Sequence, residues 1–205
     1  MVYAPVDEFT PMEVFLICTS AVAIAEIGDR TQLLALLLAT KFKRPWPVIA
    51  GIFVATIVNH GLASWLGIEI SGWLTPKTLS WLLGISFIAT GLWMLIPDKE
   101  SDESIGKFSR FGPFLTTTFA FFIVEIGDKT QIATMALAAR FHDLALVASA
   151  TTFGMMLANV PVVFLGHAAA ERLPLQYVRT IAAAIFFALG VLAILEALGI
   201  SIPGF

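Results

Sequence analysis

The sequence predicts an all-α membrane protein whose six transmembrane helices form two inverted three-helix repeats. Of its 205 residues, 58% are hydrophobic and only 13% are charged, whereas a soluble domain carries about a quarter charged residues. The apolar residues gather in runs of roughly the 20 residues that a helix needs to cross a bilayer. A heptapeptide at 26–32 occurs again at 125–131 with six of seven positions identical. The pattern has none of the alternation of an outer-membrane barrel.

The first half contains three predicted spans, at 12–40, 47–68 and 78–96. The span at 12–40 is longer than a straight crossing needs, so we expect it to be tilted or broken. Gly28 is the natural place for a break, because glycine adopts backbone conformations that end a helix. Residues 1–11 hold Asp7 and Glu8 but no Lys or Arg. That is the wrong charge for a signal peptide, so we expect the first span to be retained.

A polar stretch and three further spans follow. Residues 97–112 have the composition of a solvated linker. The later spans are predicted at 113–139, 144–168 and 177–200, and Gly127 is the equivalent break in the first of these. The expected division is therefore a first repeat at 1–96, a linker at 97–112 and a second repeat at 113–205.

The repeat extends beyond the heptapeptide at a constant offset of 99 positions. This offset relates Glu26 to Glu125, Phe42 to Phe141, Gly67 to Gly166, Phe87 to Phe186 and Gly91 to Gly190. Because each unit has an odd number of spans, the second must sit upside down relative to the first. Inverted repeats with a site at their interface are a recurring architecture of transporters.

The distribution of Lys and Arg in the short loops predicts the orientation. Two of these cations, Lys77 and Arg140, fall on one side. The other side collects Lys41, Lys43, Arg44, Lys99, Lys107, Arg110, Arg172 and Arg179. This excess predicts a cytoplasmic linker and two termini outside.

The repeated heptapeptides place charges inside predicted spans, where each costs roughly 2.5–3.5 kcal/mol at a helix centre. If each copy is helical, its Glu, Asp and cation lie at i, i+3 and i+4 on one face. The residues concerned are Glu26, Asp29 and Arg30, then Glu125, Asp128 and Lys129. Two such faces meeting across the repeat interface would carry a net charge of −2, which one divalent cation would neutralise.

The ligand types narrow the ion to a hard cation. Glu26, Asp29, Glu125 and Asp128 are the predicted metal ligands, and a cage of carboxylates favours Ca²⁺ or Mn²⁺ modestly over Mg²⁺. No His or Cys lies within a motif, as a zinc or copper site would more often require. Candidate auxiliary ligands or cavity-lining residues are Thr31, Gln32, Thr130, Gln131, Asn59 and Asn159.

Such a cluster can hold either a divalent cation or protons, which is the minimal chemistry of an antiporter. The ion is then cargo, so no cofactor is expected, and the predicted partners are the cation, protons and the lipid bilayer. The net charge of −3 gives no nucleic-acid footprint. The sequence leaves the oligomeric state open.

Several alternatives remain for the charged residues. They could form intramembrane salt bridges within each motif that bind nothing. Arg30 and Lys129 could tune the charge of the cluster, compete with the metal or hold a carboxylate in place. Asn59 and Asn159 could serve helix packing through hydrogen bonds.

Other functional classes fit the sequence less well. A six-span exporter of amino acids or another small organic solute matches the span count, but it should carry isolated charges instead of symmetric carboxylate pairs. A passive channel would share the site without proton exchange. An intramembrane aspartyl protease would place Asp29 in a Gly-x-Gly-Asp motif, and here Glu26 occupies the first Gly position. We therefore expect a transporter and not an enzyme.

The two heptapeptides resemble the signature Glu-x-Gly-Asp-Lys/Arg-Thr/Ser, present twice in a six-span family of Golgi and chloroplast Ca²⁺/Mn²⁺ transporters and bacterial Mn²⁺ exporters. The matching residues are Glu26, Gly28, Asp29, Arg30 and Thr31, then Glu125, Gly127, Asp128, Lys129 and Thr130. The resemblance covers the whole chain and implies cation/proton antiport, with the two acidic pairs as the ion site. The short N-terminus looks like the bacterial branch, which implies export of Mn²⁺ across the bacterial cytoplasmic membrane.

Overall fold

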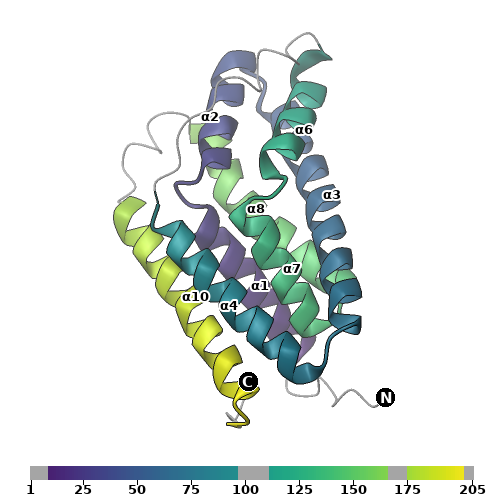
Figure 1. The fold of residues 1–205 in the computed structure, drawn as a ribbon. Helices are drawn as coiled ribbons and strands as arrows, with labels where there is room; N and C mark the ends of the chain where they lie inside the picture. The colour runs from purple at the N-terminus through teal and green to yellow at the C-terminus, as the bar shows by residue number, and fades with distance from the viewer. Residues whose placement is uncertain (1–8, 97–110, 166–174, 201–205) are drawn as a thin grey trace.

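A computed structural model of the chain describes residues 9–96, 111–165 and 175–200. Within these ranges the chain forms α-helices and no β-strand, so the all-α prediction is confirmed. The helices, coloured by residue number in Figure 1, are α1 (Pro11–Glu26), α2 (Arg30–Phe42), α3 (Pro45–Gly72), α4 (Pro76–Met94), α6 (Gly112–Glu125), α7 (Lys129–Phe141), α8 (Leu144–Leu165) and α10 (Leu175–Ala197).

Local sequence signals explain where the helices begin. The side chain of Thr10 accepts a hydrogen bond from the backbone N–H of Glu13, and Glu13 accepts one from the backbone N–H of Thr10. This capping box, with Pro11 in the first turn, starts α1. Thr75 caps α4 in a similar way, and Pro76 follows it.

The offset of 99 positions is visible in the helices themselves. It separates the first residues of α2 and α7, of α3 and α8, and of α4 and α10. Lys43 and His142, also 99 positions apart, end α2 and α7 with φ angles of 52° and 54°. Figure 1 shows α1 and α2 running from one end of the molecule to the other, while α6 and α7 run in the opposite direction.

The two halves pack against each other through equivalent helices. The first helix of each half lies on the long helix of the other half, so that α1 contacts α8 and α6 contacts α3. The helix α4 packs along α10, where the rings of Phe87 and Phe186 meet edge to face at 5.9 Å. These two aromatic residues are again 99 positions apart, so the pair straddles the interface between the halves.

The described residues contain three helices long and apolar enough to span a membrane, and a fourth if α1 and α2 form one span. The three are α3, α8 and the part of α10 from Thr180 to Ala197, whereas α1 and α2 are bent by 71° at their junction. The chain is therefore a helical membrane protein, and its described residues contain fewer independently recognisable spans than the six predicted. The span predicted at 113–139 divides into α6 and α7, and Lys77 and several Ser, Thr and Gly residues dilute the apolar character of α4.

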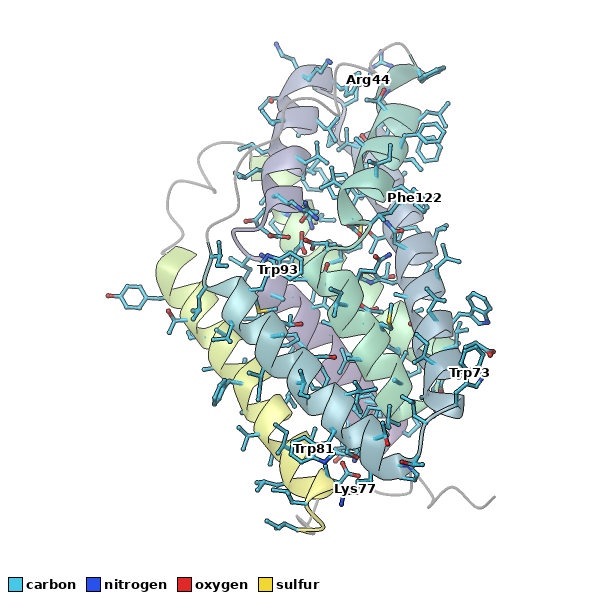
Figure 2. All side chains as sticks on the ribbon, viewed as in Figure 1. Arg44, Trp73, Lys77, Trp81, Trp93 and Phe122 are labelled. Atoms are coloured by element: carbon cyan, nitrogen blue, oxygen red, sulfur yellow. The ribbon has the colours of Figure 1, made fainter. Side chains whose placement is uncertain are left out.

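Two of the cations used in the orientation argument lie at opposite ends of the molecule. Figure 2 shows Arg44 at one end and Lys77 at the other. The start of α1 and the end of α10 lie at the same end as Lys77. Most of the predicted linker at 97–112 falls outside the described residues, as do Lys99, Lys107, Arg110 and Arg172.

Candidate functional site

Both heptapeptides interrupt their helices in the same way. In the first, the chain leaves α1 at Ile27 and turns at Gly28, where φ is 78°. The second leaves α6 at Ile126 and turns at Gly127, where φ is 73°. Glycine accepts this positive φ without the steric cost of a Cβ. The breaks predicted at these two glycines are confirmed.

The shared helical face that would follow if each motif were helical does not form, because each motif is broken at its glycine. Glu26 is the last residue of α1, and Asp29 is the N-cap of α2. The positive φ at the intervening glycine ends the helical hydrogen-bond ladder, and the N–H of Asp29 instead donates to the carbonyl of Glu26 at 3.0 Å. The second motif behaves identically, with a distance of 3.1 Å between Asp128 N and Glu125 O.

The glutamines of the motifs stabilise these breaks. The N–H of Gly28 donates to Oε1 of Gln32 at 2.8 Å, and the N–H of Gly127 donates to Oε1 of Gln131 at 2.7 Å. Backbone N–H groups released from a helix inside a membrane need such a partner. Gln32 also donates through Nε2 to the carbonyl of Ala158, at 3.1 Å. Both side chains are therefore engaged by the backbone.

Two ion pairs cross the interface between the motifs. Nη2 of Arg30 lies 2.9 Å from Oδ1 of Asp128, and Nζ of Lys129 lies 2.5 Å from Oδ1 of Asp29. Each cation therefore pairs with the aspartate of the other motif. The salt-bridge alternative had instead supposed pairing within each motif. The pairs are related by the same offset of 99 positions, and they tie the two halves together at the breaks. Figure 2 shows nitrogen and oxygen atoms gathered around this level of the molecule.

The four carboxylates lie together and are buried. Glu26, Asp29 and Glu125 are fully inaccessible, and Asp128 is 1% exposed. The carboxylate of Glu26 is close enough to those of Asp29, Glu125 and Asp128 for their charges to interact. The structure thus brings together the four side chains that the sequence singled out. They outnumber the two cations, so the cluster would have a net charge of −2 if all six groups were ionised.

Each glutamate is hydrogen-bonded by a helix of the opposite half. Oε1 of Glu26 accepts from Nδ2 of Asn159 on α8, at 3.3 Å. Oε1 of Glu125 accepts from the hydroxyl of Thr56 on α3, at 3.5 Å. The second oxygen of each glutamate is buried and has no hydrogen-bond partner among the described residues. Such an oxygen is costly in an apolar interior, which makes it a place for a cation or a proton.

The remaining predicted residues divide between the site and its scaffold. The hydroxyl of Thr130 donates to Oδ2 of Asp128 at 3.1 Å, whereas the buried hydroxyl of Thr31 has no hydrogen-bond partner in the described part of the chain. Asn59 donates to the carbonyl of Phe122, a residue labelled in Figure 2, at 3.1 Å. That bond links α3 to α6 and fits the helix-packing interpretation, but Asn59 also interacts with the Glu125 carboxylate, so both Asn59 and Asn159 lie on the site.

His60, which the sequence places near the middle of the second predicted span, also reaches the site, although it was not among the predicted ligands. Its Nε2 lies 3.9 Å from Oε2 of Glu125, and its side chain is fully buried. The offset of 99 positions relates His60 to Asn159, so the two residues occupy equivalent positions of α3 and α8. Thr56 and Met155 are equivalent in the same way, so the two halves present different side chains to their glutamates.

The cluster is an ion-paired network and not a preformed cage. Among the residues that the structure describes, no group of three or more Asp, Glu, His or Cys side chains is arranged to hold a metal ion. Asp29 and Asp128 instead face Lys129 and Arg30. Coordination of a metal by both aspartates therefore requires the two side-chain cations to move.

Comparisons with known proteins agree on one family. A family model described as divalent cation/proton antiporter GDT1 matches residues 14–102 and 113–201. The two matched segments have the same length and start 99 positions apart, as the repeat does.

Individual relatives extend from bacteria to plants. A protein of Vibrio cholerae named as a candidate manganese exporter is 50% identical over 177 residues, which cover 85% of this chain and 87% of the relative. A GDT1-like protein 3 of Oryza sativa is 27% identical over 197 residues, covering 84% of this chain and 70% of the relative. A GDT1-like protein of Synechocystis is 26% identical over 195 residues, covering 84% and 92%. No solved structure matches the chain.

Proposed function

Because the chain belongs to the GDT1 family of divalent cation/proton antiporters, we propose that it is a secondary transporter that exports Mn²⁺ from a bacterial cytoplasm in exchange for protons. The family makes the protein a transporter and not an enzyme. The Vibrio cholerae relative, named as a candidate manganese exporter and 50% identical, supports Mn²⁺ as the cargo. Ca²⁺ is a second candidate cargo, since carboxylate oxygens suit it equally. The family match sets aside the export of organic solutes.

The proposed ion site consists of Glu26, Asp29, Glu125 and Asp128. The observation that carries this proposal is the reciprocal pairing of Arg30 with Asp128 and Lys129 with Asp29, which buries four carboxylates beside only two cations. The excess charge matches one divalent cation. Both motifs contribute equally, so neither half holds the site alone.

In the proposed exchange, the carboxylates are neutralised either by Mn²⁺ or by protons together with the Arg30 and Lys129 side chains. Mn²⁺ entering the cluster displaces the Arg30 and Lys129 side chains from the aspartates, because the same oxygens cannot serve both. When Mn²⁺ leaves, the cations return to the aspartates, and protons neutralise the glutamates, whose second oxygens are buried without a hydrogen-bond partner in the described residues. The protons then leave on the opposite side of the membrane before the next ion binds.

The proposed architecture is six spans in two inverted three-helix repeats, at 1–96 and 113–205, joined by a linker at 97–112. The helix starts spaced by 99 positions, the opposed directions of α1–α2 and α6–α7 and the doubled family match support it. We place the protein in the bacterial cytoplasmic membrane with the linker in the cytoplasm and both termini outside. The opposed positions of Arg44 and Lys77 support that orientation.

Ion uptake by inside-out vesicles tests the proposed function. Vesicles with the protein should accumulate Mn²⁺ when a proton gradient is imposed, and a Glu125→Gln variant, folded and present in equal amount, should not. Parallel assays with Ca²⁺ rank the two ions. Uptake of neither ion by folded wild-type protein, with or without a gradient, would contradict the proposal.

A further inference from the structure

We propose that His60 provides a nitrogen ligand to the transported ion and thereby biases the site toward first-row transition-metal dications and against Ca²⁺. This inference rests on the proposed function, since it concerns the cargo of the same site. It differs from the sequence-based expectation, which considered only oxygen ligands because no histidine lies within a motif. The residue reaches the site from α3, outside either heptapeptide.

The surroundings of His60 are those of a ligand and not of a packing residue. The imidazole is fully buried, and neither Nδ1 nor Nε2 has a hydrogen-bond partner among the described residues. Buried polar side-chain atoms almost always have a partner, so an exception needs a cause. One turn further along α3, the buried hydroxyl of Ser64 also has no hydrogen-bond partner in the described ranges. This side of the site therefore holds donor atoms in excess of what the protein itself satisfies.

The distance from His60 to Glu125 suits a shared ion. Nε2 and Oε2 are 3.9 Å apart, which is too far for a hydrogen bond. Two atoms that each bind one ion at about 2.1 Å lie at most about 4.2 Å apart. The Oε2 atom is also the glutamate oxygen without a hydrogen-bond partner in the described residues, so both atoms are available to one ion.

The equivalent position in the other half shows that the imidazole is not required by the fold. There, Asn159 occupies the position of His60 and donates to Glu26 at 3.3 Å, and it also bonds the carbonyl of Met155 at 3.1 Å. The Nδ2 of this asparagine is thus fully engaged, while its buried Oδ1 has no hydrogen-bond partner among the described residues. The histidine at position 60 forgoes those hydrogen bonds, which leaves ligand formation as its contribution.

The chemistry of imidazole determines which ions bind more tightly to a site that contains His60. Ca²⁺ takes oxygen ligands, whereas transition-metal dications accept imidazole nitrogen, with affinity rising from Mn²⁺ to Co²⁺. A site of carboxylates with one imidazole should therefore bind Mn²⁺ and Co²⁺ better than an all-oxygen site does, and Ca²⁺ worse. The motif carboxylates then supply charge, and His60 supplies the preference between ions.

Competition during transport tests this assignment. In proteoliposomes taking up Mn²⁺, we expect His60→Asn, which copies the residue of the other half, to raise the KM for Mn²⁺ about tenfold or more, because even outer-shell partners of metals are worth 10- to 100-fold. Co²⁺ should become a weaker competitor and Ca²⁺ a stronger one. His142→Asn is the matched control, since His142 lies between α7 and α8 and asparagine tolerates its φ of 54°. An unchanged order of competition in His60→Asn would overturn the inference.

A spectroscopic measurement on wild-type protein keeps the test independent of variant folding. Electron spin echo envelope modulation of bound Mn²⁺ should show coupling to an imidazole ¹⁴N that disappears in His60→Asn and persists in His142→Asn. Bound and transported Mn²⁺ without nitrogen coupling would overturn the role of His60 and leave the proposed function intact. Failure of the wild type to bind or transport Mn²⁺ would contradict the proposed function itself.

Discussion

The two cross-motif ion pairs differ in their exposure to solvent or lipid. The side chain of Lys129 is 3% exposed, whereas that of Arg30 is 32% exposed. A charge that stays buried after its partner is removed costs about 3–5 kcal/mol, and an exposed one costs about 1 kcal/mol or less. The two formally equivalent pairs should therefore contribute unequally to stability.

We expect Asp29→Asn to lower the free energy of unfolding by about 3–5 kcal/mol, because it breaks the fully buried ion pair with Lys129. The matched change in the other pair, Asp128→Asn, should cost distinctly less, since Arg30 can reach water or headgroups. Unfolding in detergent micelles measures both. Adding Lys129→Met to Asp29→Asn should recover most of the loss, and equal destabilisation by the two single changes would contradict this account.

The composition of the site was largely predictable from the sequence, whereas its pairing was not. The duplicated heptapeptide identified all four carboxylates and both cations. It did not show that Arg30 reaches Asp128 and not its own motif, because that choice depends on how the two breaks face each other in space. The sequence placed His60 near the middle of a span, but its approach to Glu125 could not be predicted, since it comes from another helix.

At the scale of elements, the turn at each motif is what positions the carboxylates. Glu26 closes one helix and Asp29 opens the next, so both face the interface only because Gly28 permits a sharp change of direction. Gly127 has the same role in the second half. A Cβ at Gly127 would meet no heavy atom within 4 Å, so any effect of a substitution there reports backbone conformation alone.

Replacement of Gly127 by alanine should destabilise the protein by about 1–2 kcal/mol, the cost of a left-handed backbone for an L-residue. Gly127→Asn should cost less, because asparagine tolerates this conformation. Gly61→Ala, in the middle of α3 with similar open space, is the control and should be neutral or stabilising. Thermal unfolding of the three variants in micelles gives their order of stability. A Gly127→Ala variant as stable as Gly61→Ala would refute the argument that the backbone at Gly127 is strained for other residues.

A different glycine reports on packing between the halves. A Cβ at Gly67 of α3 would collide with the carbonyl oxygen of Met135 on α7. Gly67→Ala should therefore force the two helices apart and cost about 1–3 kcal/mol, against no loss in Gly61→Ala. Unfolding midpoints check this, and equal stability of the two variants would show that α3 and α7 do not approach so closely.

The sequence correctly predicted that the chain forms helices, but it predicted less well how they divide into membrane spans. Apolar runs located α3 and α8 well, and the duplicated glycines located both breaks. The fourth predicted span became two separate helices because the turn at Gly127 divides its apolar residues, and the helical face expected for Glu125 and Asp128 was lost at the same turn. Hydrophobicity alone does not reveal such an interruption, since the residues on either side stay apolar.

At the scale of the whole molecule, the proposed orientation places Arg44 in the cytoplasm and Lys77 outside. Both residues are exposed and lie at opposite ends (Figure 2). Cys18 is the only cysteine and is fully buried, so the native chain offers little background to a membrane-impermeant thiol reagent. Single introduced cysteines can therefore report the side on which each end lies.

We expect Lys77→Cys to react with an impermeant maleimide added to intact cells, and Arg44→Cys to react only in inside-out vesicles. The reason is the excess of Lys and Arg at the Arg44 end, which the positive-inside rule assigns to the cytoplasm. Labelling of both variants is read on gels after purification. The reverse pattern would mean that the orientation in the membrane is opposite to the proposed one. Labelling of both cysteines from one side would contradict a membrane crossing between residues 44 and 77.

The central claim is that one ion site is shared by the two repeats, and simultaneous recording of Mn²⁺ entry and internal pH in proteoliposomes tests it most directly. Wild-type protein should couple Mn²⁺ entry to proton exit, and Glu26→Gln and Glu125→Gln, one change in each repeat, should each abolish both fluxes while the protein stays folded. If either variant keeps both fluxes at the wild-type rate, the two motifs do not form a single site.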